Sequence, residues 1–163
     1  MTISKTLQLA LAAVLFAGGV ARAQLPVVPA ADQELLLASA DPKLAANKKL
    51  VFDFWREVFE AGHMDLADRY MAEGYIQHNP NVPTGRAAFV AFFTQFVKPK
   101  AIQPRIAAPL VTMVAEGDLV ILSFVRETAS PKDATKKSTT TWFDMFRVEN
   151  GKIAEHWDCA PKQ

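Results

Sequence analysis

A hairpin near the C-terminus constrains the fold of this chain more than any other feature. Residues 138–159 contain two β-type runs on either side of an Asn-Gly pair. An Asn-Gly pair between strand-like segments is a strong signal for a tight hairpin turn. The two runs carry Asp144, His156 and Asp158 among apolar residues. Ionisable groups on a strand with one packed face are costly unless they form a site, so the hairpin also marks a candidate place for chemistry.

The register of this hairpin is open to two alternatives. If Asn-Gly forms a two-residue turn, Asp144 lies opposite Trp157 and Asp158 points to the other face. If Gly151 takes the left-handed position of a three-residue loop with a bulge, Asp144 lies opposite His156 and Asp158 shares their face. Because side chains alternate along a strand, one residue of register decides whether the two carboxylates meet.

Helix signals come before the strand signals. Asp41 followed by Pro42 is typical of a helix start, and apolar residues then recur at three- and four-residue spacing up to Gly62, which predicts one long helix. The spacing predicts two further helices, at about 64–71 and 86–96. We expect a short extended piece at 75–78, strands at 105–115, 119–127, 138–149 and 152–159, and loops at 79–85 and 130–137. Helices followed by antiparallel strands indicate an α+β fold.

The first residues have the pattern of a secretory signal peptide. After Lys5, a run of 14 residues (7–20) carries no charge, and small residues then flank a possible cleavage site before Gln24. The run is too short to span a bilayer as a helix. We therefore predict a signal peptide at 1–23, a linker at 24–44 and one domain at 45–160. The mature protein is expected to be periplasmic or secreted, with no membrane attachment after cleavage.

Composition excludes several functions. The formal net charge is +1, and removal of Lys5 and Arg22 with the signal peptide makes it −1. No basic block supports a nucleic-acid partner. Cys159 is the single cysteine, so no intrachain disulfide can form. The spacing of the histidines and the cysteine matches no structural zinc site.

Three segments together resemble the SnoaL-like branch of the nuclear transport factor 2-like superfamily, which contains polyketide cyclases. These segments are 48–62, 75–80 with Gly85, and 146–158, and the resemblance covers about residues 45–159. It implies a cone-shaped α+β barrel, in which three N-terminal helices pack on a curved, mostly antiparallel sheet around an apolar pocket. It also implies no metal, no cofactor, and a homodimer formed through the outer face of the sheet.

The resemblance also implies roles for site residues. Asp158 matches the aspartate that acts as general acid/base in SnoaL-type cyclases, and Asp144 stands where those cyclases have a histidine. We expect Asp158 to be the base, Asp144 to share or relay its proton, and His78 with Gln77 to polarise a carbonyl group. A loop position for His78, holding the Asn-Pro turn that follows it, is the alternative.

Other residues are expected to bind the substrate. Tyr75, Trp55, Gln77 and His156 are predicted to line the pocket, and a place on the sheet surface is the alternative for His156. The expected function is cofactor-free acid/base chemistry on a small apolar carbonyl compound, by aldol condensation or cyclisation, isomerisation or dehydration. The alternative is a non-catalytic, ligand-binding or stress-related exported domain of the same fold.

Overall fold

The computed structural model describes residues 25–130 and 133–163. The predicted signal peptide, residues 1–23, lies outside the described residues. Within the described part, no helix is long and apolar enough to cross a membrane.

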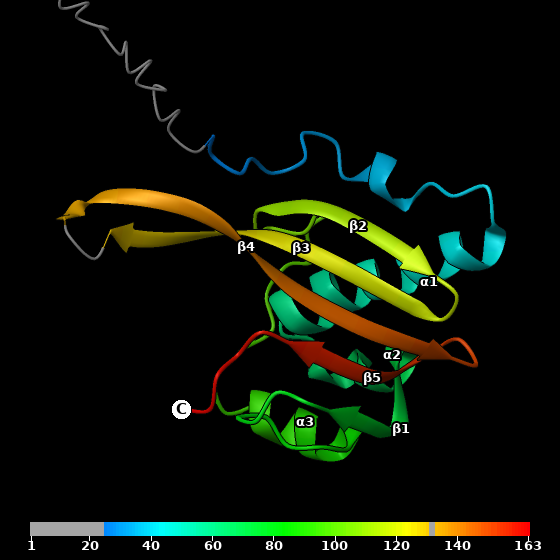
Figure 1. Cartoon of the computed structure of the whole chain (residues 1–163). Coiled ribbons are helices and arrows are strands. Elements are labelled where there is room, and N and C mark those ends of the chain that lie inside the picture. Colours follow the sequence, from blue (N-terminus) through cyan, green and yellow to red (C-terminus); the bar gives the residue numbers. More distant parts are fainter. Residues whose placement is uncertain (1–24, 131–132) are drawn as a thin grey trace, which may run out of the picture.

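A curved sheet of five strands forms one layer of the molecule and the helices form the other (Figure 1). The strand order is β1-β5-β4-β3-β2, in which β1 pairs parallel with β5 and all other neighbours are antiparallel. The strands are β1 (Met71–Gln77), β2 (Leu110–Glu116), β3 (Leu119–Ser130), β4 (Asp133–Glu149) and β5 (Lys152–Asp158). Helices packed on one face of a mostly antiparallel sheet confirm the predicted α+β class.

The long first helix lies across the concave face of the sheet (Figure 1). It begins as α1 (Pro42–Phe54), whose first turn is capped by the side chain of Asp41, which accepts from the backbone N–H of Lys43 at 2.7 Å. It continues as a π-helix, η2 (Trp55–Glu60). Gly62 follows with a φ of 77°, and a Cβ there would lie 2.9 Å from the carbonyl oxygen of Lys98. The predicted start and end of this helix are therefore confirmed, each for a local reason.

The other helices are short. They are the 3-10 helices η1 (Glu34–Leu37) and η3 (Met64–Leu66), and the α-helices α2 (Ala67–Tyr70) and α3 (Arg86–Phe93). Between the first helix and the sheet lies an aromatic core, in which Trp55 stacks on Phe124 with ring centroids 4.6 Å apart and Phe54 meets the edge of Phe146 at 6.0 Å. This core holds the first helix against β3 and β4, and so fixes one wall of the site described below.

The hairpin formed by β3 and β4 is longer than predicted and extends beyond its neighbours (Figure 1). Residues 133–137 belong to β4 and pair with the end of β3, where a polar loop at 130–137 was expected. Ser, Thr and Lys residues make this segment read as a loop. It is a strand because a two-stranded ribbon satisfies its backbone groups while its polar side chains remain in solvent.

Residues 25–40, expected as part of a linker, contact the domain over much of their length. Ala30 donates its backbone N–H to the carbonyl oxygen of Leu110 at 2.8 Å. The amide of Gln33 is buried and bonds both backbone groups of Ile106, at 2.9 and 3.0 Å. This segment therefore covers the free side of β2.

Candidate functional site

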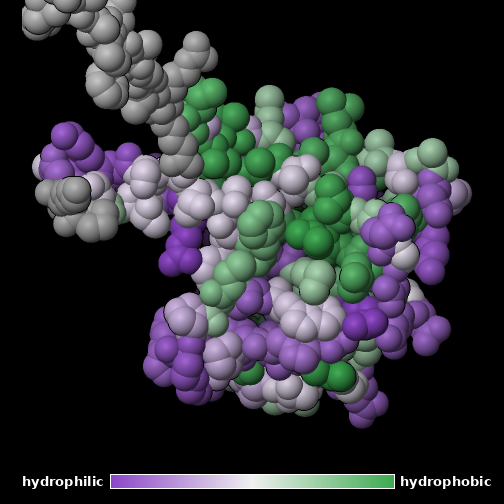
Figure 2. Space-filling view, in the orientation of Figure 1, coloured by the Kyte–Doolittle hydropathy of each residue, from purple (hydrophilic) through white to green (hydrophobic). Residues whose placement is uncertain are grey.

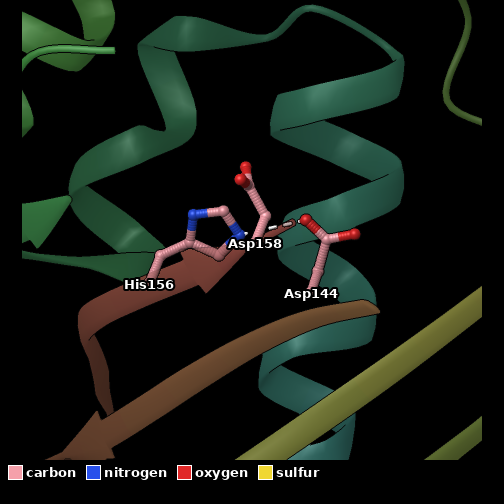
Figure 3. A group of neighbouring side chains, drawn as sticks. All are labelled: Asp144, His156 and Asp158. Carbon is pink, nitrogen blue, oxygen red and sulfur yellow. Dashed lines mark hydrogen bonds and ion pairs between the residues drawn. The ribbon is translucent and has the colours of Figure 1, made fainter. Parts of the chain in front are cut away.

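Three ionisable side chains converge on the concave face of the sheet (Figure 3). Asp144 comes from β4, and His156 and Asp158 come from β5. Each offers one nitrogen or oxygen atom within 4.8 Å of the others. Asp144 and His156 are buried and Asp158 is partly exposed. The side chains predicted from the hairpin therefore do meet.

The register that brings them together combines parts of both predicted alternatives. Asn150 and Gly151 have φ angles of 50° and 70° and form a two-residue turn, so that Val148 pairs with Ile153. Ala154 is then an extra residue in β5, because the next pair is Arg147 with Glu155. This bulge shifts the register by one residue and places Asp144 directly opposite Asp158.

Gln77 at the end of β1 holds His156 from the side away from Asp144. Its Oε1 accepts the backbone N–H of Asn79 at 2.9 Å, and since that group can only donate, the orientation of the amide is fixed. The same oxygen lies 2.9 Å from Nδ1 of His156. Nδ1 must therefore carry a hydrogen and donate it to Gln77.

This tautomer decides how His156 meets Asp144. Nε2 of His156 lies 3.1 Å from Oδ1 of Asp144. With Nδ1 already protonated, Nε2 is an acceptor in the neutral ring and a donor only in the imidazolium ion. A hydrogen bond between these two atoms therefore needs one proton, carried either by the imidazole or by the carboxyl group. The pair is a store for a single proton.

Burial gives Asp144 an unusual affinity for that proton. Burial raises the pKa of the Asp144 carboxyl above its ordinary value, and the nearby charge of Asp158 raises it further. The hydrogen bond and charge of His156 and the side chain of Trp142 act in the opposite direction without cancelling this rise. Among the described residues, Oδ2 of Asp144 is a buried oxygen with no hydrogen-bond partner. Both features favour the protonated carboxyl group over an isolated buried carboxylate.

Both carboxylate oxygens of Asp158, unlike those of Asp144, accept hydrogen bonds from N–H groups. Its Oδ2 accepts from the side-chain amide of Asn79 at 2.6 Å and its Oδ1 accepts from the backbone N–H of Ala160 at 2.8 Å. Both partners are N–H donors, which match the charged carboxylate. The site thus combines a carboxylate held by donors with a proton shared by a neighbouring pair.

The cavity beside these groups is enclosed mainly by aromatic side chains. It leaves about 90 Å³ for the centres of water-sized molecules. Tyr75, Gln77 and Trp55, predicted to line the pocket, do line it, and so does His156, for which a surface position was the alternative. The remaining lining residues are Phe54, Phe59, Asn79, Val82, Phe89, Phe93, Asp144, Phe146 and Asp158.

Tyr75 brings a hydroxyl group to this cavity. Its oxygen accepts from Nε2 of Gln77 at 2.9 Å, which leaves its own hydrogen available to a bound molecule. Burial raises the pKa of the Tyr75 hydroxyl far above its usual range, and the charges of Asp158 and Asp144 raise it further. Tyr75 therefore remains a hydrogen-bond donor at neutral pH.

His78 lies outside the cavity, and its predicted role beside Asp158 is corrected. Its ring stacks on Trp157 with centroids 4.9 Å apart, and its Nε2 lies 2.7 Å from Oε1 of Glu155. Side chains alternate along an extended segment, so Tyr75, Gln77 and Asn79 face the cavity while His78 points to the other side. Among the predicted site residues, His78 is the one that the fold keeps apart from the others.

Asn79 is a site residue that the sequence reading missed. It was placed in a turn because Asn-Pro is a common turn pair. The signal that identifies it is the two-residue period from Tyr75 through Gln77, which places position 79 on the same face. Its amide oxygen accepts the backbone N–H of Asn81 at 2.9 Å, which turns the amide nitrogen toward Asp158.

The three ionisable groups also have the chemistry of a metal site, since two carboxylates and one imidazole are common ligands of divalent cations. To bind an ion through Nε2, His156 would have to release Oδ1 of Asp144. Nδ1 is committed to Gln77, so the ring has no other nitrogen to offer. A ring with Nδ1–H held by an acceptor and Nε2 facing a carboxylate is also the form that a metal-ligating histidine takes, so the hydrogen bonds are compatible both with a shared proton and with an ion.

Comparison with known proteins places the chain in a family. Residues 51–156 match the model of the SnoaL-like domain, so the chain belongs to this family, as the sequence resemblance predicted. No curated protein matches it significantly.

Solved structures share the fold. One is described as a "putative SnoaL-like polyketide cyclase" from Jannaschia sp. CCS1, with 17% identity and a TM-score of 0.52, over 75% of this chain and 90% of that chain. Another is an LEH-like epoxide hydrolase of M. tuberculosis, with 13% identity and a TM-score of 0.50, over 72% of this chain and 84% of that chain. At these identities the likeness establishes the cone-shaped α+β fold alone.

Proposed function

We propose that this protein is an enzyme that performs cofactor-free acid/base chemistry on a small, largely apolar carbonyl compound. The observation that carries the proposal is the pairing of Asp158 with Asp144 and His156 on one wall of an aromatic cavity. A carboxylate held by two donors can accept a proton, and the neighbouring pair holds a proton to return. A proton acceptor and a proton donor are therefore present within one site.

The proposed reaction begins with removal of a proton from the carbon next to the carbonyl group. Asp158 accepts this proton, the electron pair of the C–H bond forms a C=C bond, and the π pair of the carbonyl group moves onto its oxygen to give an enolate. Tyr75 donates its hydroxyl hydrogen to that oxygen and stabilises the developing charge. The proton shared by Asp144 and His156 then neutralises the product anion, and Asp158 later passes its proton to the pair or to water.

Aldol condensation or cyclisation, isomerisation and dehydration all share this first step. The two fold relatives described above are named as a polyketide cyclase and an epoxide hydrolase, so the fold hosts small-molecule chemistry in those proteins. Because the enclosed space is small, we propose that the reacting end of the substrate is only a few heavy atoms in size.

Proton exchange tests the first step without knowledge of the natural product. The protein is incubated in D₂O with small ketones, beginning with acetophenone, and deuterium incorporation next to the carbonyl is followed by NMR. We expect wild-type protein to accelerate exchange and Asp158→Asn to lose about 10²–10⁴ of that acceleration, the usual contribution of a general base. Asp65→Asn, on an exposed carboxylate outside the site, is the matched control.

Three results would contradict the proposal. Exchange by Asp158→Asn within a few-fold of wild type would remove Asp158 from the base role. Ketones that bind the cavity without any exchange would indicate the alternative, a binding domain without catalysis. Treatment with EDTA is expected to leave the rate unchanged, and a loss of rate would point to a metal ion held by Asp144, His156 and Asp158.

We also propose that the protein acts outside the cytoplasm. The support is the uncharged run at 7–20 followed by small residues before Gln24. Mass spectrometry of the exported protein is expected to find Gln24 at or near its N-terminus. Intact Met1 in the exported fraction would refute cleavage.

A further inference from the structure

A second, more open hollow adjoins the cavity along the concave face of the sheet. It leaves about 410 Å³ for the centres of water-sized molecules, and its walls include Phe124, Trp142 and Arg126. Trp55 and Asp144 line both spaces. A molecule whose reacting end lies in the cavity would therefore extend into this hollow.

Strand alternation explains why these side chains continue the wall of the site. Asp144 and Trp142 are two residues apart on β4, and Trp142 pairs with Phe124 on β3. Arg126 follows Phe124 by two residues and so lies on the same face. Trp142 lies two residues, about 7 Å, along β4 from Asp144, and the guanidinium group of Arg126 lies over the Trp142 ring. The guanidinium group is therefore separated from Asp144 by roughly the length of a substituted ring.

Arg126 places its own positive charge in the part of the hollow farthest from the cavity. Its guanidinium carbon lies 4.6 Å from the centre of the Trp142 ring, which orients the group without neutralising it. Across residues 25–130 and 133–163, no ion pair involves Arg126, and the adjacent Glu127 is bound by Lys137 at 2.7 Å. Arg126 is thus a positioned cation without a carboxylate partner, and guanidinium groups bind carboxylates through two parallel hydrogen bonds.

From this arrangement we infer that the hollow is a subsite for the anionic end of the substrate and that Arg126 binds its carboxylate. The inference rests on the proposed function for the reacting end, and it narrows the substrate class to carbonyl compounds that carry a carboxylate beyond a flat apolar portion. The carboxylate of Asp158 opposes entry of the substrate's carboxylate at the inner end, so charge also sets the direction in which the substrate binds.

A matched pair of probes tests the subsite directly. 4-Acetylbenzoate and 4-acetylbenzamide have the same ring and ketone, but only the first carries a charge. By isothermal titration calorimetry, we expect wild-type protein to bind the acid about tenfold more tightly than the amide, as one partly exposed charge-assisted contact would give. Arg126→Gln should abolish this preference while leaving the affinity for the amide unchanged. Arg126→Lys should keep part of it.

Lys136→Gln is the control, because it removes one positive charge from the same hairpin at a position outside the hollow. It should preserve the preference. Equal affinity of wild type for acid and amide, failure of both probes to bind at millimolar concentration, or an unchanged preference in Arg126→Gln would each overturn the inference. Deuterium exchange of the uncharged amide measures the proposed acid/base activity without the carboxylate. The proposed activity and the proposed Arg126 subsite can therefore fail independently.

Discussion

Asp144 lies directly opposite Asp158, although the turn that joins their strands would by itself place Trp157 there. The extra residue Ala154 corrects the register between the turn and the site. The consequence is a face that carries a carboxylate, an imidazole and a second carboxylate side by side (Figure 3). The position of the proton shared by His156 and Asp144 can be measured directly by experiment.

The tautomer of His156 can be observed by NMR. Because Gln77 accepts the hydrogen of Nδ1, we expect the ¹⁵N shift of Nδ1 to be that of a protonated nitrogen across the pH range in which the protein is folded. Nε2 should show an intermediate shift in wild type, and the shift of a bare nitrogen in Asp144→Asn. A bare Nδ1 in the wild-type protein would contradict the proposed proton store.

The buried carboxyl of Asp144 predicts how stability depends on pH. Its folded-state pKa is raised by burial above the ordinary value of 3.8, so the native protein binds more protons than the unfolded chain between these two values. Stability is therefore expected to fall as pH rises from about 4 through the folded pKa. Asp144→Asn removes this titration, and its urea-unfolding profile should be flatter over the same range.

The comparison needs a control because other groups titrate as well. Asp65→Asn alters an exposed carboxylate, with 72% of its side chain accessible, and should follow the wild-type profile. If the profiles of Asp144→Asn and wild type ran parallel from pH 4 to pH 8, burial of Asp144 would not be a source of pH dependence.

Substitutions at the neighbouring positions 78 and 79 should differ in their effect on activity. Asn79→Ala removes the amide that holds Asp158, so we expect a loss of about tenfold in ketone exchange, the equivalent of one hydrogen bond to a charged group. His78→Ala removes a ring stacked on Trp157 outside the cavity, so its rate should remain within a few-fold of wild type. The reverse order would restore the catalytic role that the sequence suggested for His78.

The outer face of the sheet is proposed to bind a second copy of the chain. Figure 2 shows apolar side chains gathered on this face, and a hollow there is lined by Ile121, Phe143, Met145 and Trp157. Phe143 is 46% exposed beside this hollow, so it offers a large apolar surface that a second chain could cover. We expect a dimeric mass for wild type in light scattering and a monomer for Phe143→Glu. A monomeric wild type at micromolar concentration would refute the dimer.

The sequence predicted the elements of this fold better than it predicted the site. The long helix and the Asn-Gly turn have local causes, namely a capping aspartate, a terminating glycine and a turn pair, and both are found where expected. The bulge at Ala154 has no local signal, because an alanine in a strand looks the same whether or not it is paired. The register of the two carboxylates therefore stayed open.

The side chains that β1 and the residues after it bring to the site could be predicted only in part. The alternation of Tyr75, Gln77 and Asn79 was present in the sequence and would have excluded His78 from the cavity. What the sequence could not show is that β1 lies parallel to β5 and brings Gln77 against His156. Such a pairing depends on the whole chain between them.

That parallel pairing has a consequence for how the protein is made. Gln77 and His156 are 79 positions apart, as are Asn79 and Asp158, so the hydrogen bonds that organise the site join the first strand of the sheet to its last. On the ribosome the helices and the cavity walls from β1 to β3 emerge before β5 exists, and contacts of such long sequence separation form late. A chain cut short before Asp158 would keep most of its aromatic core and lack the proposed base. Proton-transfer capacity is therefore expected to arise only when synthesis is nearly complete.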